Sequence, residues 1–379
     1  MNHKKIYVTK TSLPPYDEYI KAIESLWDSR FITNMGKYHH DFESRLKDFL
    51  QVPNLSLMVN GHMALEMTIQ AHNFPKGSEV ITTPFTFVST THAIVRNGLV
   101  PIFCDIKADN FLLDESRIEE LITENTVAIV PVHVYGNVCN IEVIESIAQK
   151  YDLKVIYDAA HAFGVKYKGS GIGSFGNASI FSFHATKVFN SIEGGAVASN
   201  NSDLPDKIYN LKNFGIRNEE LVVSIGANAK MNEFQAIMGI CNLKYFERNV
   251  AARKLIVEKY HELLCNVEGV RLLCFNEDIE RNYAYFPVLF EENEHGVERD
   301  DIFNALAKNQ INARKYFYPL TADQACFKNK YHAIPLETAR YCSDRIMVLP
   351  LYPELLFDDV ERICDIIKDT LSCNEENKS

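Results

Sequence analysis

Short apolar runs alternate with helical patterns along the first half of the chain, and this alternation constrains the fold more than any other feature. We expect strands at 55–59, 79–82, 100–105, 127–132, 154–158, 178–183 and 195–199. Several of these runs are apolar at every position, which is typical of strands covered on both faces. Strands that alternate with helices form mostly parallel sheets, so an α/β fold with an αβα sheet is predicted. Ligands bind such sheets at the carboxyl ends of the strands.

The rest of the chain predicts a second, smaller α/β unit. A helical pattern that runs from Asn232 towards Leu264 links the two parts. We therefore divide the chain into a large domain, 1–245, which includes amphipathic helices near 16–30 and 39–50, and a small domain, 246–379. The small domain is expected to contain strands at 270–275, 283–290 and 313–318, a last helix at 357–367 and a polar tail at 373–379.

Composition excludes several classes of protein. The net charge is −11, from 39 basic and 50 acidic residues, which argues against a general surface for nucleic acid or anionic membranes. No apolar run approaches the roughly 18 residues of a membrane span, and the first residues lack the apolar core of a signal peptide. The nine cysteines form no CxxC pair, so we expect reduced thiols, no metal site and a cytoplasmic location.

Two of the predicted strands lead to residues that a pyridoxal phosphate (PLP) enzyme requires. One ends on Asp158, and the next is followed by Lys187. A lysine amine forms a Schiff base with the cofactor aldehyde, and an aspartate holds the pyridine nitrogen protonated, which makes the ring an electron sink. Either residue alone has an ordinary explanation, because most such lysines are solvated and most such aspartates are turn residues or helix caps.

Neighbouring features strengthen this pair. Asn60, Gly61 and His62 stand between a predicted strand and a helical pattern, and free amides at such a helix start can cradle a phosphate. His161 follows Asp158 by three residues, although a histidine at a helix start can also simply pack. The glycines at 169–173 lack the spacing of a dinucleotide fingerprint and are expected in a hairpin or loop. A hydrolase triad is disfavoured because no G-x-S-x-G motif is present.

At these motifs the chain resembles the PLP-dependent nucleotide-sugar aminotransferases of the DegT–DnrJ–StrS group, within the fold type I superfamily. The resemblance extends from about residue 5 to about residue 370. Its most specific segments are 33–36 (TNMG), 83–90 (TPFTFVST), 130–136 (VPVHVYG), 157–161 (YDAAH), 182–187 (SFHATK), 193–195 (EGG) and 226–231 (GANAKM).

The resemblance implies roles for individual residues. Lys187 matches the lysine that carries the cofactor, and Asp158 matches the partner of the pyridine nitrogen. His161 stands where the family has Gln or His on the ring hydroxyl, and Phe87 matches an aromatic residue that stacks on the ring. The phosphate cup matches Gly61, His62, Ser182 and Asn228, the last from the neighbouring subunit of a homodimer with shared active sites.

Substrate contacts are implied more loosely. Thr33 and Asn34 fall in the loop that resembles part of the sugar pocket. The segment 314–318 (RKYFY) is compatible with a surface strand or with a contact to a nucleotide diphosphate, in which case Lys315 is a candidate.

Three features decide which of the family's residue roles can be assigned to this chain. The cup has Asn-Gly-His where Ser-Gly-Thr is commoner, so its backbone amides are kept while its side-chain contact changes. Lys230 stands where many members carry Arg, which removes any bidentate contact there. Lys187 itself is kept, whereas relatives that catalyse dehydration carry His at that position.

The resemblance implies transfer of an amino group from an amino acid, L-glutamate, to a nucleotide-linked keto sugar. The segments 12–19 and 33–36 resemble enzymes that aminate C4 of dTDP-4-keto-6-deoxyglucose. The product would be dTDP-4-amino-4,6-dideoxyglucose, for a surface glycan such as the O-antigen of lipopolysaccharide or for a glycosylated natural product. The alternatives are a C3-aminotransferase, a PLP-dependent sugar dehydratase and a noncatalytic sensor; the last two are disfavoured by Lys187 and by the intact pair with Asp158.

Overall fold

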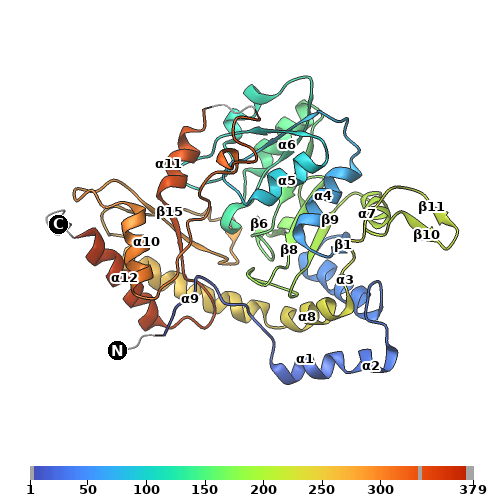
Figure 1. Ribbon diagram of the computed structural model, residues 1–379, viewed down its shortest axis with the longest axis horizontal. Coiled ribbons are helices and arrows are strands. Elements are labelled where there is room, and N and C mark those ends of the chain that lie inside the picture. The colour runs from blue at the N-terminus through green and yellow to red at the C-terminus, as the bar shows by residue number, and fades with distance from the viewer. Residues whose placement is uncertain (1–3, 332–334, 373–379) are drawn as a thin grey trace.

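The computed structural model describes residues 4–331 and 335–372. Figure 1 shows a larger part built around a central sheet and a smaller part that contains the C-terminal helices, with α8 Glu233–Leu243 and α9 Phe246–Leu264 following one another end to end from the first part to the second. No helix in the described ranges is long and apolar enough to cross a membrane. The predicted α/β class with a mostly parallel sheet is confirmed.

The central sheet has seven strands in the order β1-β9-β8-β5-β4-β2-β3. Their bounds are β1 Asn54–Met58, β2 Glu79–Thr82, β3 Val100–Phe103, β4 Thr126–Val130, β5 Lys154–Asp158, β8 Ala178–Ser182 and β9 Gly195–Ser199. All seven sequence predictions are confirmed to within about two residues. β9 is antiparallel to both of its neighbours, β1 and β8, and the other neighbouring pairs are parallel. The carboxyl ends of the other six strands therefore share one edge of the sheet.

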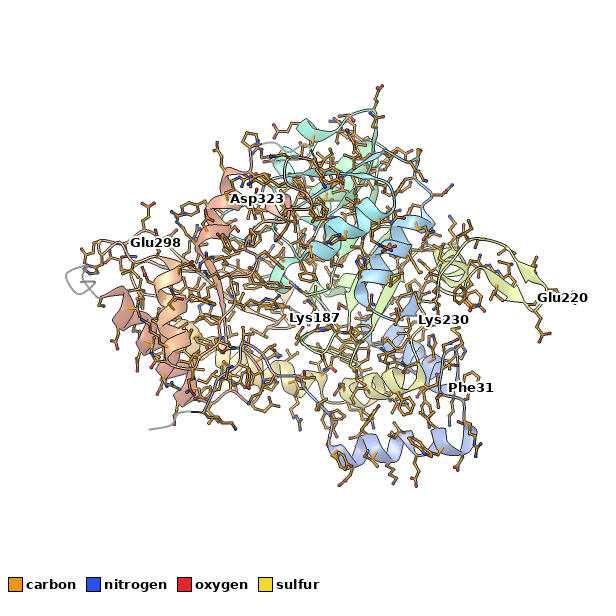
Figure 2. The ribbon with its side chains drawn as sticks, in the orientation of Figure 1. Phe31, Lys187, Glu220, Lys230, Glu298 and Asp323 are labelled. Carbon is orange, nitrogen blue, oxygen red and sulfur yellow. The ribbon has the colours of Figure 1, made fainter. Side chains whose placement is uncertain are left out.

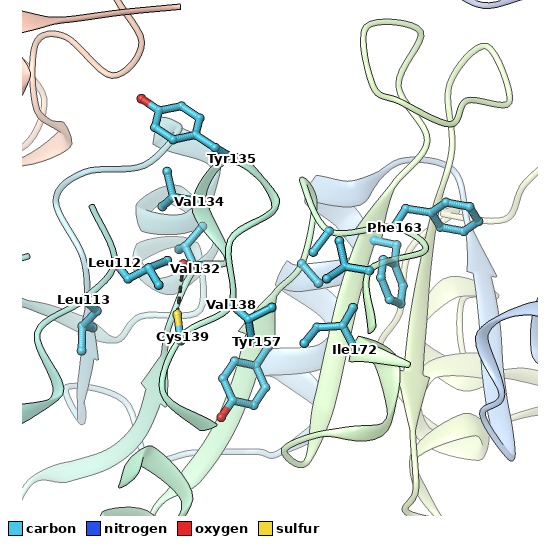
Figure 3. Close-up of a cluster of buried hydrophobic side chains, with 14 of the residues drawn as sticks. Leu112, Leu113, Val132, Val134, Tyr135, Val138, Cys139, Tyr157, Phe163 and Ile172 are labelled. Carbon is cyan, nitrogen blue, oxygen red and sulfur yellow. Dashed lines mark hydrogen bonds between the residues drawn. The ribbon is translucent and has the colours of Figure 1, made fainter. Parts of the chain in front are cut away.

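Helices cover both faces of this sheet because alternate strand residues point to opposite sides. On β5, Ile156 packs in one apolar cluster while Val155 and Tyr157 pack in another. The cluster of Ile156 includes buried residues of α4 Gly61–Ala71, α5 Val88–Arg96 and α7 Leu204–Lys212. The cluster of Tyr157 includes residues of α3 Lys37–Leu50, α6 Ile141–Lys150 and α8 Glu233–Leu243, and Figure 3 shows part of it.

The C-terminal unit has its own three-stranded antiparallel sheet and apolar cluster. The sheet consists of β12 Val270–Leu272, β14 Phe286–Phe290 and β15 Ile346–Leu349. Residues of α9 Phe246–Leu264, α10 Arg299–Lys308 and α12 Phe357–Leu371 pack in the cluster. The predicted last helix is confirmed and continues to Leu371. Cys373–Ser379, predicted to be a polar tail, lies outside the described residues.

The strand prediction at 313–318 was wrong. Only Arg314 forms a bridge, to Val348, and the third strand is instead β15. The segment turns away because Tyr316 and Phe317 pack into the large apolar cluster of the central sheet. The Tyr135 hydroxyl donates to the Tyr316 carbonyl, which holds that backbone against the large part. Tertiary packing has therefore overridden local strand propensity.

The predicted long helix from Asn232 is broken near the proposed domain boundary. α8 begins with a capping box in which Asn232 accepts from the Gln235 amide, at 2.9 Å. It ends at Leu243, and α9 begins at Phe246. The break lies beside residue 245, where the sequence predicts the boundary between the two domains. That domain boundary stays a prediction.

Shorter elements complete the chain. The N-terminal pattern forms α1 Tyr16–Ile23 and α2 Ser25–Ser29. The glycines at 169–173 were expected in a hairpin or loop. A hairpin of β6 Lys166–Tyr167 and β7 Ser170–Gly171 forms there, and β6 also pairs with β13 Ile279–Glu280. β10 Ile216–Asn218 and β11 Leu221–Val222 form a projecting arm, with Glu220 near its tip in Figure 2. The remaining helices are α11 Glu337–Arg345 and the short η1 Glu115–Arg117, η2 Glu119–Leu121, η3 Val134–Gly136, η4 Ile172–Ser174 and η5 Thr321–Asp323.

Candidate active site

A cavity of about 380 Å³ opens at the carboxyl edge of the central sheet. Lys187 lines it and lies near the middle of the molecule, between the two parts (Figure 2). Residues from the ends of β1, β2, β5 and β8 meet there, together with the segment at 314–316 from the C-terminal unit. The cavity brings together seven of the predicted site residues: Gly61, His62, Phe87, Asp158, His161, Ser182 and Lys187.

Glycine is required where the β1–α4 turn meets the neighbouring strands. A Cβ on Gly61 would lie 2.7 Å from the Cβ of Ser182, at the end of β8. A Cβ on Gly195 would lie 2.6 Å from the Asn60 carbonyl carbon. This close approach sets the first turn of α4 directly against the strand that leads to Lys187. Its early amides have no acceptor within the helix, so they are available to an anion.

The side chains of the cup are held by further contacts. Asn60 caps α4 by accepting from the Met63 amide at 2.8 Å. His62 lies between the Ser89 hydroxyl, at 2.9 Å from Nδ1, and the Glu66 carboxylate, at 3.1 Å from Nε2. The hydrogen bond from His62, followed by the one from Arg96, lowers the pKa of Glu66 despite its partial burial. His62 is therefore fixed at the helix start by two polar partners.

Asp158 is a buried carboxyl group at the end of β5. Its Oδ2 accepts from the Thr90 hydroxyl at 2.8 Å, and its Oδ1 accepts from the Ala160 amide at 3.1 Å. Burial raises the pKa of this carboxyl, while the bonds from Thr90 and Ala160 and the charge of Lys187 oppose that rise. Burial is the larger effect, so the charged form of Asp158 is disfavoured without a ligand, and a cationic ligand group beside it would stabilise the carboxylate.

His161 is held as a neutral ring. Its Nδ1 accepts from the Tyr135 amide at 3.1 Å, which leaves Nε2 as the nitrogen that carries the proton. Burial lowers the pKa of His161 well below its usual range, and the charges of Lys187 and Arg314 lower it further. The ring also lies parallel to Phe317 and beside Tyr285, at centroid distances of 6.0 and 4.6 Å. A neutral Nε2–H group in this position can donate to an oxygen of a ligand.

Among the described residues, the amine of Lys187 has one hydrogen-bond partner. Its Nζ donates to the Tyr285 hydroxyl at 3.4 Å, a long bond that leaves its other donors available. Burial raises the pKa of Tyr285 to about 12, so this phenol stays neutral at physiological pH. Lys187 is half-buried, which places its amine at the wall of the cavity and within reach of a ligand.

The other four predicted residues do not line this cavity. Asn228 is exposed and pairs through its backbone with Asn213, at the base of the β10–β11 arm. Thr33 and Asn34 lie in the loop between α2 and α3, whose Ile32 carbonyl accepts from the start of α8. Lys315 points away from the cavity, since its Nζ lies 2.6 Å from Asp300. Their roles stay predictions.

The sequence did not identify every cavity residue. In the candidate segment 314–318, Arg314 and Tyr316 line the cavity and Lys315, the residue chosen from that segment, does not; Tyr285, which contacts Lys187, was not singled out. Successive side chains of an extended backbone point to opposite sides, so the sequence could place Arg314 and Tyr316 on one side and Lys315 on the other. It could not show that this segment reaches the site. Thr90 lies in the TPFTFVST motif, but nothing in the sequence distinguishes its hydroxyl from that of Thr91.

These residues fit PLP. The β1–α4 turn, which a Cβ on Gly61 would crowd, offers backbone amides to a phosphate. No cation of the described residues forms an ion pair with the buried Asp158 carboxyl, and a pyridinium nitrogen would provide one. Phe87 keeps 49 % of its surface exposed at the cavity, where a flat ring could cover it. Lys187 supplies the amine. The cavity residues therefore include a suitable partner for the phosphate, for the ring nitrogen and for the aldehyde of PLP.

Comparison with known proteins agrees with this chemistry. Residues 16–368 match the DegT/DnrJ/EryC1/StrS aminotransferase family model. The chain is 41 % identical over 366 residues to a dTDP-4-amino-4,6-dideoxy-D-glucose transaminase of Shigella dysenteriae, covering 97 % of this chain and 99 % of that protein. A protein of the same name from Escherichia coli is 39 % identical over 372 residues, with the same coverage.

A solved structure is similar along the whole fold. It is the crystal structure of DesI in the presence of its TDP-sugar product, which aligns with a TM-score of 0.94 and 29 % identity. The alignment covers 99 % of this chain and 95 % of DesI.

Two adjacent threonines offer a matched test of the Asp158 site. Thr90 and Thr91 are both fully buried, but only the Thr90 hydroxyl bonds to Asp158; the Thr91 hydroxyl has no partner among the described residues. Thr90→Val removes a bond that lowers the pKa of Asp158, so that pKa rises further. As the pH falls, Asp158 of the variant therefore becomes protonated at a higher pH than Asp158 of the wild type. We expect PLP to bind on the order of tenfold more weakly near pH 6, measured by fluorescence titration.

Thr91→Val is the control, because it removes an unpartnered hydroxyl and should leave both PLP affinity and its pH profile unchanged. Equal effects of the two substitutions, or none from Thr90→Val, would contradict the role given to the Thr90 bond.

Proposed function

Because the chain belongs to the DegT/DnrJ/EryC1/StrS aminotransferase family, we propose that it transfers an amino group from L-glutamate to C4 of dTDP-4-keto-6-deoxyglucose. The family consists of PLP-dependent sugar aminotransferases, and the chain is accordingly a PLP-dependent enzyme that uses an amino donor and a sugar acceptor. The product would be dTDP-4-amino-4,6-dideoxyglucose. The observation that carries this choice is the similarity to two transaminases named for that amino sugar.

In the proposed reaction each side chain of the cavity has one task. When bound, PLP supplies an aldehyde that exchanges amines and a ring that spreads negative charge. Lys187 holds the cofactor and, once released, moves a proton at the donor α-carbon as a general base. Asp158 holds the proton on the ring nitrogen, which its buried carboxylate favours. His161 donates from Nε2 to the ring hydroxyl, and Phe87 covers one face of the ring.

The phosphate is proposed to bind at the start of α4. The amides of Gly61 and His62 face it there, and the Ser182 hydroxyl adds a donor from the end of β8. Thr33, Asn34 and Lys315 stay candidates for contacts to the nucleotide sugar. Lys315 is the weakest of them because its amine pairs with Asp300 on the other side of the backbone.

We propose a homodimer in which Asn228 completes the neighbouring phosphate site. Support comes from the absence of Asn228 from the described cavity lining of its own chain and from apolar side chains exposed on the adjoining arm. Val222 keeps 64 % and Ile225 keeps 90 % of their surface exposed on the arm. Trp27 of α2 and Phe31 of the loop after it are also exposed, at 65 % and 51 %. A partner subunit would bury such residues.

We also propose that the enzyme works in the cytoplasm. Support comes from the cysteines: the eight in the described chain are all free, and three of them, Cys265, Cys274 and Cys326, are exposed. Reduced, unpaired thiols are typical of that compartment.

Regiochemistry tests the proposed reaction. The enzyme, given dTDP-4-keto-6-deoxyglucose, PLP and L-glutamate without an isomerase, should form the 4-amino sugar, located by NMR of the isolated product. The amine can enter only where a carbonyl stands, so C3 transfer would need the ketone moved first. A product that appears only after a 3,4-ketoisomerase is added, with nitrogen on C3, would favour the C3-aminotransferase alternative.

Complementation tests the shared site. Lys187→Ala and Asn228→Ala homodimers should each be inactive or strongly impaired. Each heterodimer of the two chains contains one site with both native residues, so a one-to-one mixture exchanged through mild denaturation should regain about a quarter of wild-type activity. Mixtures that stay as inactive as the separate variants, or an active monomer, would rule out an Asn228 that acts across subunits.

A further inference from the structure

Asn282 joins the two parts of the molecule at the segment that carries His161. It lies between β13 and β14, and only 2 % of its surface is exposed. Its Nδ2 donates to the His161 carbonyl at 2.9 Å and to the Phe163 carbonyl at 3.0 Å. Its Oδ1 accepts from the Ala284 amide at 3.1 Å. Both amide hydrogens and the oxygen of this buried carboxamide are therefore engaged.

The two carbonyls depend on this one side chain. Among the described residues, no other group donates to the carbonyl of His161 or to that of Phe163. Both residues are buried, and a buried carbonyl without a partner loses the free energy of its hydrogen bond to water. Loss of the Asn282 carboxamide would therefore favour a different backbone conformation at His161.

The chain leaves room for this side chain at Gly136. The φ angle of Gly136 is +83°, in the left-handed region that glycine adopts without strain. A Cβ there would lie 2.7 Å from the Asn282 Oδ1 and 3.0 Å from the His161 carbonyl oxygen. Tyr135, the residue before it, donates its amide to the His161 Nδ1 at 3.1 Å. The backbone of His161 is thus held by Asn282, and its ring by the segment that makes room for Asn282.

Asn282 also leads directly to Tyr285. Ala284, whose amide Asn282 fixes, precedes Tyr285, and the Tyr285 ring lies 4.6 Å from the His161 ring. The Tyr285 hydroxyl contacts the Lys187 amine. One carboxamide therefore holds two neighbouring side chains of the site together, one from each part of the molecule.

We infer that Asn282 is a positioning residue for His161. It is absent from the described cavity lining, so it acts on a ligand through the residues that it holds. By binding the His161 carbonyl from the C-terminal unit, it keeps the ring of His161 at the cavity wall, where Nε2–H donates to the ring oxygen of PLP. This positioning role rests on the proposed function of His161 towards that oxygen.

A double-mutant cycle on PLP affinity tests whether Asn282 acts through His161. Asn282→Ser keeps an acceptor for the Ala284 amide and loses the Nδ2 donors. In the wild-type background it should weaken PLP binding about tenfold, measured by fluorescence titration of the full-length protein. His161→Ala should weaken binding as well. In the His161→Ala background, Asn282→Ser should cost less than about twofold, because the ring that it positions is gone.

Asn282→Asp provides the same cycle with a side chain of unchanged size, since it replaces the Nδ2 donors with an oxygen that accepts. The cycle measures PLP binding alone, so its outcome does not depend on which sugar or which carbon receives the amine. Equal losses with and without the His161 ring would overturn the positioning role, as would wild-type affinity in both Asn282 variants. If His161→Ala itself leaves PLP affinity unchanged, the proposed function of His161 and the positioning role both fail.

Asn137→Ser is the matched control. Asn137 is also buried and also joins the two parts, since its Nδ2 donates to the Cys274 carbonyl at 3.4 Å. Both serine variants should lower the melting temperature, but only Asn282→Ser should shift the visible absorption band of bound PLP and weaken PLP binding. The same band shift and affinity loss in Asn137→Ser would show a general loosening of the two parts and would overturn the role given to Asn282.

Discussion

The buried carboxylate of Asp158 is the interaction on which the rest of the site depends. Burial at a strand end disfavours its charge, and the structure opposes that tendency with two hydrogen bonds and the nearby charge of Lys187. A cationic group beside this carboxyl would stabilise its charged form, and a protonated ring nitrogen of PLP is such a group. In the proposed arrangement, the amides of α4 bind the phosphate, His161 donates to the ring oxygen and Lys187 holds the aldehyde.

The two parts of the chain meet at this point. The larger part supplies most of the cavity lining, including Asp158 and Lys187, whereas the C-terminal unit supplies Tyr285, Arg314 and Tyr316 to this region. The Tyr135 hydroxyl and the aromatic cluster of Phe317 hold the latter segment against the sheet.

Sequence predicts the large sheet well because its strands are short, apolar and separated by helical patterns, and the strand-end rule then places Asp158 and Lys187 at one edge. Sequence predicts poorly which residues of the C-terminal unit reach the cavity. The segment 313–318 has strand propensity, but its aromatic residues are buried between the units, and only the fold shows that Arg314 reaches the cavity while Lys315 does not. Thr90 and Thr91 are a similar case, since both are buried threonines and only their three-dimensional surroundings distinguish them.

The most direct test of this account is to find where the cofactor is attached. The holoenzyme should be reduced with borohydride, digested and mapped by mass spectrometry, with a Lys187→Ala holoenzyme treated in parallel. We predict a single phosphopyridoxyl group on Lys187 in the wild type, none in the variant, and loss of amino transfer in the variant. A reduced cofactor on another lysine, or full activity without Lys187, would contradict the central claim.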